Sequence, residues 1–242
     1  HHIPPSSIRE LDQLARQLNQ MASRLLELDK IKTEFVANIS HELRSPLAAM
    51  EGYLQLLLPE KGATPQAGEN LARIQVNLAR LRHLVENLLE ISRIEAHQSQ
   101  NRPERVDIKE AAREICDLFA PRLKTRKLTL EVHIPVSASR AYADPAKLRQ
   151  ILVNLLDNAI KYNSPGGKVG VSAKTDANLL YLAIHDTGPG IRPEYVDSLF
   201  KRFQRLPPSS PELAQVKGAG LGLAISRSLA RMMGGDIRFE RE

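Results

Sequence analysis

A short glycine-containing segment is the first part of this sequence whose residue types could recognise a ligand. Residues 186–190 read DTGPG and follow a strand-like stretch, so Gly188 and Gly190 allow a tight turn while the Asp186 carboxylate stays at the strand end. A carboxylate there can accept a hydrogen bond from the exocyclic amine of adenine and would repel the carbonyl of guanine. The segment therefore predicts adenine selectivity, and an Asp-capped turn without a ligand is the alternative.

A second glycine-rich segment opens a helical stretch. Residues 218–222 read GAGLG, and free backbone N–H groups at a helix start attract phosphate. The predicted phosphate-binding residues are Gly218, Gly220, Leu221 and Gly222. The spacing excludes a dinucleotide fingerprint because Leu223 stands at the last glycine position, and no P-loop sequence occurs. A flexible hinge is the alternative.

Two asparagines on one predicted helix form the third candidate. Asn154 and Asn158 are four residues apart in the amphipathic segment 151–162 and so share a face. An amide oxygen can hold Mg²⁺ that triphosphate oxygens already bridge, and Lys161 can neutralise phosphate charge. Asn158 is the predicted metal ligand, and asparagines without function are the alternative.

His41 is the candidate nucleophile. A neutral imidazole offers one nitrogen lone pair to a phosphorus atom, and the adjacent Glu42 can accept or orient the proton on the other nitrogen. Pro46 cannot donate to the carbonyl of Glu42, which predicts a kink one turn beyond His41. A histidine satisfied within a core is the alternative.

The apolar period changes along the chain, and it indicates which elements carry these residues. Heptad spacing from Leu11 to about Leu58 and again from Leu71 to Ile91 predicts a helical hairpin. Because a lone hairpin exposes one side of its seam, two copies are expected to pair into a homodimer. Strands are predicted at residues 127–134, 168–173, 179–184 and 236–241, and helices at residues 107–124, 145–162, 192–200 and 220–233. The predicted fold class is α+β multidomain, a dimeric antiparallel four-helix bundle followed by an α/β sandwich with its strands on one sheet.

Composition excludes several classes of protein. The 242 residues carry a net charge of +6, are 42% hydrophobic and include one cysteine, so a disulfide scaffold is excluded. No apolar run is long enough to span a bilayer, so we expect no membrane contact by this fragment. Aromatic residues make up 4% and tryptophan is absent, which argues against nucleic acid as a partner. The positive charge lies mostly in residues 99–242 and suits a small polyanion such as a nucleotide.

In this order, the asparagine helix, the DTGPG turn and the GAGLG helix start resemble the ATPase fold shared by DNA gyrase, the MutL mismatch-repair proteins and histidine kinases. The segment around His41 resembles the phosphoacceptor box of sensor histidine kinases. The resemblance implies ATP and Mg²⁺ as cofactors, transfer of the γ-phosphoryl group to His41, and relay to an aspartate of a response-regulator receiver domain. It also implies nucleotide contacts from Tyr162 and Phe200, with residues 204–217 as a mobile lid. Ser45 stands where many such kinases have Thr, and its hydroxyl can orient water for phosphatase activity.

The resemblance also suggests domain boundaries. Residues 1–29 resemble the last helix of a HAMP signal-relay module, residues 30–98 form the phosphotransfer hairpin, and residues 103–242 form the ATP-binding domain, without its last strand. The native protein is then expected to begin upstream with a sensor and a membrane span, with this part on the cytoplasmic side. Two other functions stay open. A gyrase- or MutL-like ATPase is disfavoured because such proteins commonly carry Glu where Asn154 lies, and a non-catalytic ATP-binding scaffold is excluded only by activity.

Overall fold

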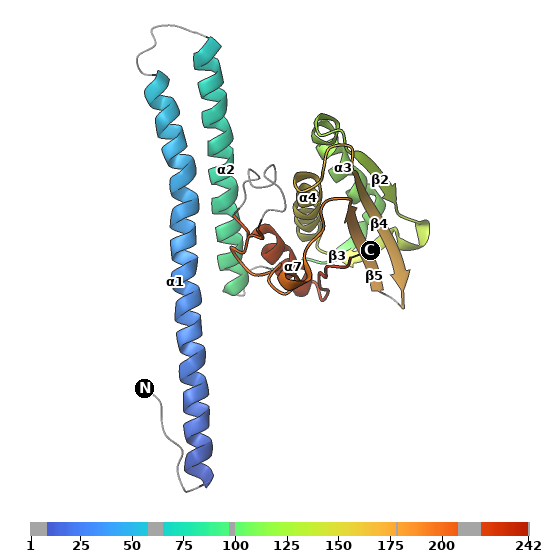
Figure 1. Cartoon of the computed structure of the whole chain (residues 1–242). Helices are drawn as coiled ribbons and strands as arrows, with labels where there is room; N and C mark the ends of the chain where they lie inside the picture. The colour runs from blue at the N-terminus through green and yellow to red at the C-terminus, as the bar shows by residue number, and fades with distance from the viewer. Residues whose placement is uncertain (1–8, 58–64, 97–99, 178, 208–218, 242) are drawn as a thin grey trace. The chain divides into compact units, whose positions relative to one another are not determined.

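The computed structural model describes residues 9–57, 65–96, 100–177, 179–207 and 219–241. Within the hairpin some side chains, including that of His41, lie outside the described part. The chain divides into two compact units, residues 1–84 and 85–242, and each is treated by itself (Figure 1). Among the described helices, none combines the length and apolar content that crossing a bilayer needs.

The first unit holds one long helix and most of a second, which lie side by side and run in opposite directions (Figure 1). Helix α1 spans Arg9–Leu57 and α2 spans Pro65–Glu95, which confirms the predicted hairpin. Helix α1 continues through Pro46, whose ring is buried. Arg73 of α2 donates to the Tyr53 hydroxyl of α1 at 3.3 Å, and its guanidinium lies 5.6 Å from the centre of that ring. This cation–π contact links the two helices.

The hairpin leaves many large apolar side chains in water. The exposed ones among its described residues are Leu14, Leu18, Met21, Leu26, Leu47, Leu54, Leu71, Val76, Leu78, Val85 and Leu89. They come from both helices and recur along their length. One chain by itself therefore does not bury its own apolar seam.

The second unit combines two small sheets with helices. In chain order its elements are β1 (Glu104–Asp107), α3 (Ile108–Thr125), β2 (Thr129–His133), a short 3₁₀ turn (Val136–Ala138), β3 (Arg140–Ala143), α4 (Pro145–Lys161), β4 (Lys168–Asp176), β5 (Leu179–Asp186), α5 (Pro193–Val196) and α7 (Gly222–Met232). Strand β4 is central in a three-stranded sheet, parallel to β2 and antiparallel to β5. The strands expected at residues 127–134, 168–173 and 179–184 share this sheet, as predicted. Strands β1 and β3 were not predicted, and they pair with each other separately. Each has only four residues, too few to show an alternating pattern.

Two predicted elements differ from the structure. The helix expected at residues 192–200 is reduced to α5, because the following N–H groups bond three residues back, as in Ser198 to Tyr195 at 3.0 Å. The strand expected at residues 236–241 was wrong, since this segment is irregular. At its start the Asp236 carboxylate accepts the N–H of Ile237 at 2.9 Å, so that donor is unavailable to a sheet.

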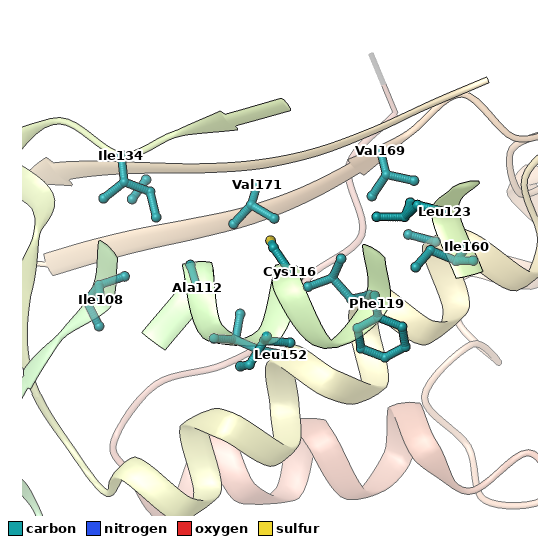
Figure 2. Packing of buried hydrophobic residues seen from close by; sticks show 14 of the residues in the cluster. Ile108, Ala112, Cys116, Phe119, Leu123, Ile134, Leu152, Ile160, Val169 and Val171 are labelled. Atoms are coloured by element: carbon teal, nitrogen blue, oxygen red, sulfur yellow. The ribbon is translucent and has the colours of Figure 1, made fainter. Parts of the chain in front are cut away.

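Helix α4 lies in the middle of the second unit. Together with α3 it packs on one face of the three-stranded sheet, where Val169 and Val171 point inward (Figure 2). Ala173 continues this buried alternation along β4. Its own Leu152, Leu156 and Ile160 are fully buried, and α7 packs on α4 as well. The core also holds Cys116, and burial raises the pKa of its thiol. Contacts with the sheet, α3 and α7 therefore fix α4 and the asparagines it carries.

Candidate functional site

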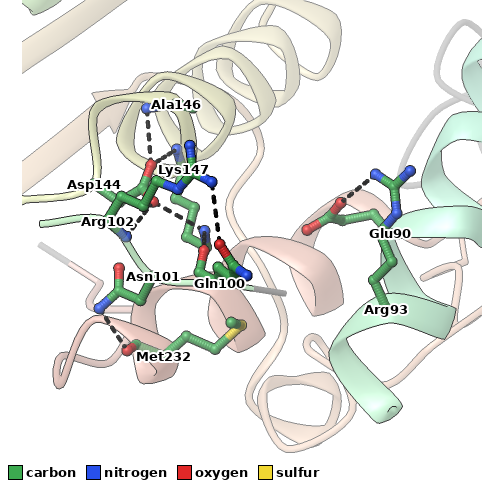
Figure 3. A network of polar contacts seen from close by, with 9 residues as sticks. All are labelled: Glu90, Arg93, Gln100, Asn101, Arg102, Asp144, Ala146, Lys147 and Met232. Carbon is green, nitrogen blue, oxygen red and sulfur yellow. Dashed lines mark hydrogen bonds and ion pairs between the residues drawn. The ribbon is translucent and has the colours of Figure 1, made fainter. Parts of the chain in front are cut away.

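Both ends of α4 are held by side chains. At its start Asp144 Oδ1 accepts the N–H groups of Ala146 and Lys147, each at 3.1 Å (Figure 3). At its end Arg126 donates to the carbonyls of Ile160 and Lys161 at 2.6 and 2.7 Å. Asn154 and Asn158 lie between these caps, so the helix presents them from a fixed backbone.

Asn154 contacts the start of α7. Its Nδ2 donates to Ser226 Oγ at 3.3 Å and lies 3.5 Å from the carbonyl of Gly222. Ser226 is completely buried between the two helices. Asn158 lies one turn further along α4 and is half-buried. The structure therefore brings the asparagine helix and the GAGLG segment together, although they are far apart in the sequence.

Lys161 is already engaged in an ion pair. Its ammonium contacts Asp157 one turn earlier, and Asp157 also binds Arg122 of α3 at 2.6 Å. A lysine ammonium has three donors, so Lys161 can keep Asp157 while it contacts a phosphate. The next residue, Tyr162, caps α4 with its N–H on the Asn158 carbonyl at 3.0 Å and keeps a side chain that is 40% exposed.

The DTGPG turn lies against the end of α4. Asp186 is exposed, and its Oδ1 accepts the N–H of Gly188 at 2.8 Å. A Cβ on Gly188 would lie 2.9 Å from the carbonyl oxygen of Tyr162 and 2.7 Å from Asp186 Oδ1, so no side chain fits there. Gly190 has a φ of +70°, which glycine adopts without strain. The turn thus holds an exposed carboxylate beside Tyr162.

The start of α7 meets the segment that contains Phe200. Gly220 has a φ of +67°, and a Cβ there would lie 2.8 Å from the carbonyl of Gln204. Its own carbonyl accepts the N–H of Phe203 at 2.9 Å. Leu221 is buried, and α7 begins at Gly222 with no side-chain cap among the described residues, so its first N–H groups are free for an anion. Gly218 lies outside the described residues.

Sequence reasoning missed a polar cluster around Phe200. The Arg227 guanidinium lies 4.7 Å from the centre of the Phe200 ring and binds both carboxylate oxygens of Asp236, at 2.8 and 3.0 Å. Arg231 adds a third contact at 3.2 Å. The hydrogen bond from Arg227 holds the pKa of Asp236 well below its usual range. The sequence did offer one indication of this cluster, because Arg227 and Arg231 are four residues apart on a predicted helix and Asp236 follows them.

The candidate nucleophile belongs to the first unit. The backbone of His41 lies in α1, and its side chain is outside the described part of the structure. On the same helix Glu42 is half-buried and Ser45 is exposed. Among the described residues, no group of three or more His, Cys, Asp and Glu side chains could hold a metal ion.

Comparison with known proteins decides the family. Residues 31–97 match the family model of the His Kinase A (phospho-acceptor) domain, and residues 143–242 match that of the histidine kinase-, DNA gyrase B- and HSP90-like ATPase. The solved structure of the Acinetobacter baumannii histidine kinase AdeS is 30% identical with a TM-score of 0.66, and the match covers 84% of this chain and 91% of that one. The chain belongs to the histidine kinase family.

Two further histidine kinases show how much of such a protein the chain represents. The signal transduction histidine-protein kinase BaeS of Escherichia coli strain K12 is 31% identical over 97% of this chain and 49% of its own length. The structure of full-length ShkA in complex with AMPPNP is 30% identical with a TM-score of 0.60, over 83% of this chain and 41% of that one. The chain spans about half the length of the curated relatives it matches. The predicted family and the predicted hairpin followed by an α/β domain are confirmed.

Proposed function

We propose that this chain is the catalytic core of a sensor histidine kinase that phosphorylates its own His41 from Mg²⁺-bound ATP. One observation carries the proposal. Asn154 of α4 contacts the start of α7, and the Asp186 turn packs against the end of α4. Three segments from different parts of the sequence thus bring an amide, a carboxylate and backbone N–H groups to one helix. His41 lies within residues 31–97, which match the phospho-acceptor domain model.

The residues of the second unit suit the parts of a nucleotide. The exposed Asp186 carboxylate accepts from the adenine amine, and the N–H groups at the start of α7 bind phosphate. Asn158 and Lys161 are half-buried residues in the last turn of α4 and suit Mg²⁺ and phosphate oxygens, with Tyr162 beside the base. The metal ion would neutralise charge on the phosphates.

The transfer itself forms one bond and breaks one. A neutral imidazole nitrogen of His41 attacks the γ-phosphorus, the bond from that phosphorus to the bridging oxygen breaks, and ADP leaves. The proton on the other imidazole nitrogen passes to, or is oriented by, Glu42. The phosphoryl group then moves to an aspartate of a response-regulator receiver domain. Ser45 has an exposed hydroxyl that can orient water to hydrolyse the regulator's phosphate.

We assign residues 1–29 to a HAMP-like relay helix, residues 30–98 to the phosphotransfer hairpin and residues 103–242 to the ATP-binding domain. The hairpin acts as a homodimer. Support comes from the continuous helix Arg9–Leu57 and from the exposed apolar residues on both hairpin helices.

The decisive experiment is incubation with Mg²⁺ and ATP labelled on the γ-phosphate, followed by acid or alkali. We expect label on the protein that survives alkali and is lost in acid, and its absence from His41→Gln. His83→Gln is the matched control, because His83 is an exposed histidine of the same hairpin, and it keeps the label. Nucleotide binding without label in any protein supports a scaffold instead, and steady phosphate release without label supports a gyrase-like ATPase.

A further inference from the structure

A buried asparagine joins the nucleotide-site helix to the adenine turn. Asn163 follows Tyr162 and is 5% exposed. Its Nδ2 donates to the carbonyl of Lys168 at 2.8 Å, and its Oδ1 accepts the N–H of Ser164 at 2.9 Å and the hydroxyl of Thr187 at 3.3 Å. One side chain therefore connects the end of α4, the start of β4 and the residue after Asp186.

Thr187 completes this network from the other side. Its N–H donates to the Lys168 carbonyl at 3.1 Å, and its hydroxyl accepts the Lys168 N–H at 2.8 Å. The paired register of β4 and β5 ends at Asp186 opposite Val169. Thr187 therefore extends the pairing by one residue, with its hydroxyl in place of a backbone acceptor. This contact fixes the backbone immediately after Asp186.

The space inside the network is closed. A Cβ on Gly167 would lie 2.3 Å from Asn163 Oδ1 and 2.7 Å from Thr187 Oγ1, so only glycine lets the amide and the hydroxyl meet. Among the described residues, no buried side-chain nitrogen or oxygen lacks a hydrogen-bond partner. The arrangement needs a donor and an acceptor on one side chain, which an amide supplies.

From this network we infer that Asn163 is a positioning residue for base recognition, which acts through Thr187 to hold Asp186 where its carboxylate meets the exocyclic amine of adenine. The inference rests on the proposed nucleotide site. Asp186 itself is exposed and begins a turn that contains two glycines, so its orientation depends on the residues that fix its backbone. Its Oδ1 is already bound to Gly188, and this bond sets the direction of the carboxylate only if the turn stays in place.

The test compares two nucleotides that differ only in the group Asp186 is expected to bind. Calorimetric titration with Mg²⁺ measures the Kd of ATP and of the purine ribonucleoside triphosphate that lacks the 6-amino group. For Asn163→Ala we expect a roughly tenfold or greater rise in the Kd of ATP, because a hydrogen bond to a charged group is misplaced. The Kd of the analogue should stay within about twofold, since the analogue never made that bond. An equal loss for both nucleotides, or no loss for either, overturns the inference.

Variants at Thr187 keep the inference testable if Asn163→Ala fails to fold. Thr187→Val replaces the hydroxyl with a methyl group and should cause the same selective loss, whereas Thr187→Ser keeps the hydroxyl and should keep the preference for ATP. The double variant Asn163→Ala with Thr187→Val should lose no more of the preference for ATP over the analogue than either single variant, because both act through one contact. If Thr187→Val and Thr187→Ser show the same preference for ATP over the analogue, the positioning role of Asn163 and Thr187 is contradicted.

Asn101→Ala is the matched control. Asn101 is an exposed asparagine whose Nδ2 donates to the Met232 carbonyl at 3.2 Å, and its loss should leave both Kd values unchanged.

Failure of the proposed nucleotide site itself would give a different result. If the parent chain binds neither nucleotide, the nucleotide site itself is wrong. If it binds both equally, Asp186 does not read the amine. In either case the inference about Asn163 fails together with its basis, whereas a parent chain that prefers ATP isolates the role of Asn163.

Discussion

Glycines at the candidate site are required for different reasons. Gly190 has a positive φ angle with open space around it, whereas Gly188 is needed because the Tyr162 carbonyl and the Asp186 carboxylate leave no room for a Cβ. Gly220 combines a positive φ angle with crowding by the Gln204 carbonyl. Crowding and backbone conformation have different consequences, since a crowded Cβ displaces its neighbours and an unfavourable φ only costs stability. Substitutions with alanine separate the two effects.

We predict that Gly188→Ala weakens ATP binding by about tenfold or more, because contacts of 2.7 and 2.9 Å force the turn away from α4. Gly234→Ala is the control, since Gly234 has a φ of +81° with open space around it. It should lower stability by about 1–2 kcal/mol and leave the ATP affinity unchanged. Titration calorimetry with urea unfolding measures both quantities, and normal ATP affinity in Gly188→Ala would contradict the crowding argument.

Asp144 is predicted to make stability depend on pH. Burial raises its pKa, but hydrogen bonds from the Arg102 N–H at 2.9 Å and from Lys147 outweigh burial and lower the pKa to about 2 (Figure 3). Because the unfolded pKa is about 3.9, the carboxylate stabilises the fold fully above that pH, and this stability is lost as the pH falls toward 2. We expect a contribution on the order of 2 kcal/mol.

Urea unfolding between pH 6 and pH 3 checks the role of Asp144. The parent chain should lose stability over this range, and Asp144→Asn should lose less, since the amide carries no proton linkage. Asp107→Asn is a suitable comparison, because Asp107 also caps a helix, at the N–H of Glu110, but from an exposed strand end. Equal pH slopes for the parent and Asp144→Asn would show that the buried pair does not set this dependence.

At the scale of elements, α4 is the one on which site and core meet. Leu152 is completely buried in the core (Figure 2), so Leu152→Ala should cost about 2–5 kcal/mol of unfolding free energy. Leu118→Ala on α3 is the control, because that side chain is 58% exposed and its loss should cost within about 0.5 kcal/mol. If Leu152→Ala and Leu118→Ala unfold at the same urea concentration, this assignment of the core is wrong.

Elements with a strong apolar period were predictable from sequence, and elements fixed by distant side chains were not. Helix α4 and strand β4 show clear periods of 3.6 and 2, and both form within a few residues of the prediction. The strand expected at residues 236–241 had a suitable pattern, but the carboxylate of Asp236 engages Arg227 and the N–H of Ile237 instead. Such contacts depend on tertiary structure, which local spacing does not encode.

The site shows the same division. Motif spacing was enough to single out Asp186, Asn154 and the glycines, because each motif is contiguous. The network of Asn163 with Thr187 had no such signal, since its partners are 24 residues apart in the chain. The ion pair of Lys161 with Asp157 lies within one helix and was visible as an i,i+4 spacing, but sequence alone did not show that Arg122 also binds Asp157.

At the scale of the whole molecule, the exposed seam of the hairpin predicts self-association. Leu54 of α1 and Leu78 of α2 are 49% and 56% exposed, and a partner hairpin would cover such residues. Leu54→Glu combined with Leu78→Glu should convert a dimer to a monomer in sedimentation velocity, because charge cannot be buried there without cost. Gln55→Glu adds charge at an exposed polar position and should leave the dimer intact. A dimer that survives the double change would place the interface elsewhere.

The one cysteine of the sequence has a practical use. The Cys116 sulfur lies in the core between α3 and the sheet, and burial raises the pKa of its thiol, so both access and ionisation oppose alkylation. A thiol reagent can therefore modify the native protein only when this core opens. The labelling rate therefore reports local opening of the core around Cys116, with no engineered probe and no background from other thiols. Bound nucleotide should slow this labelling in proportion to its occupancy.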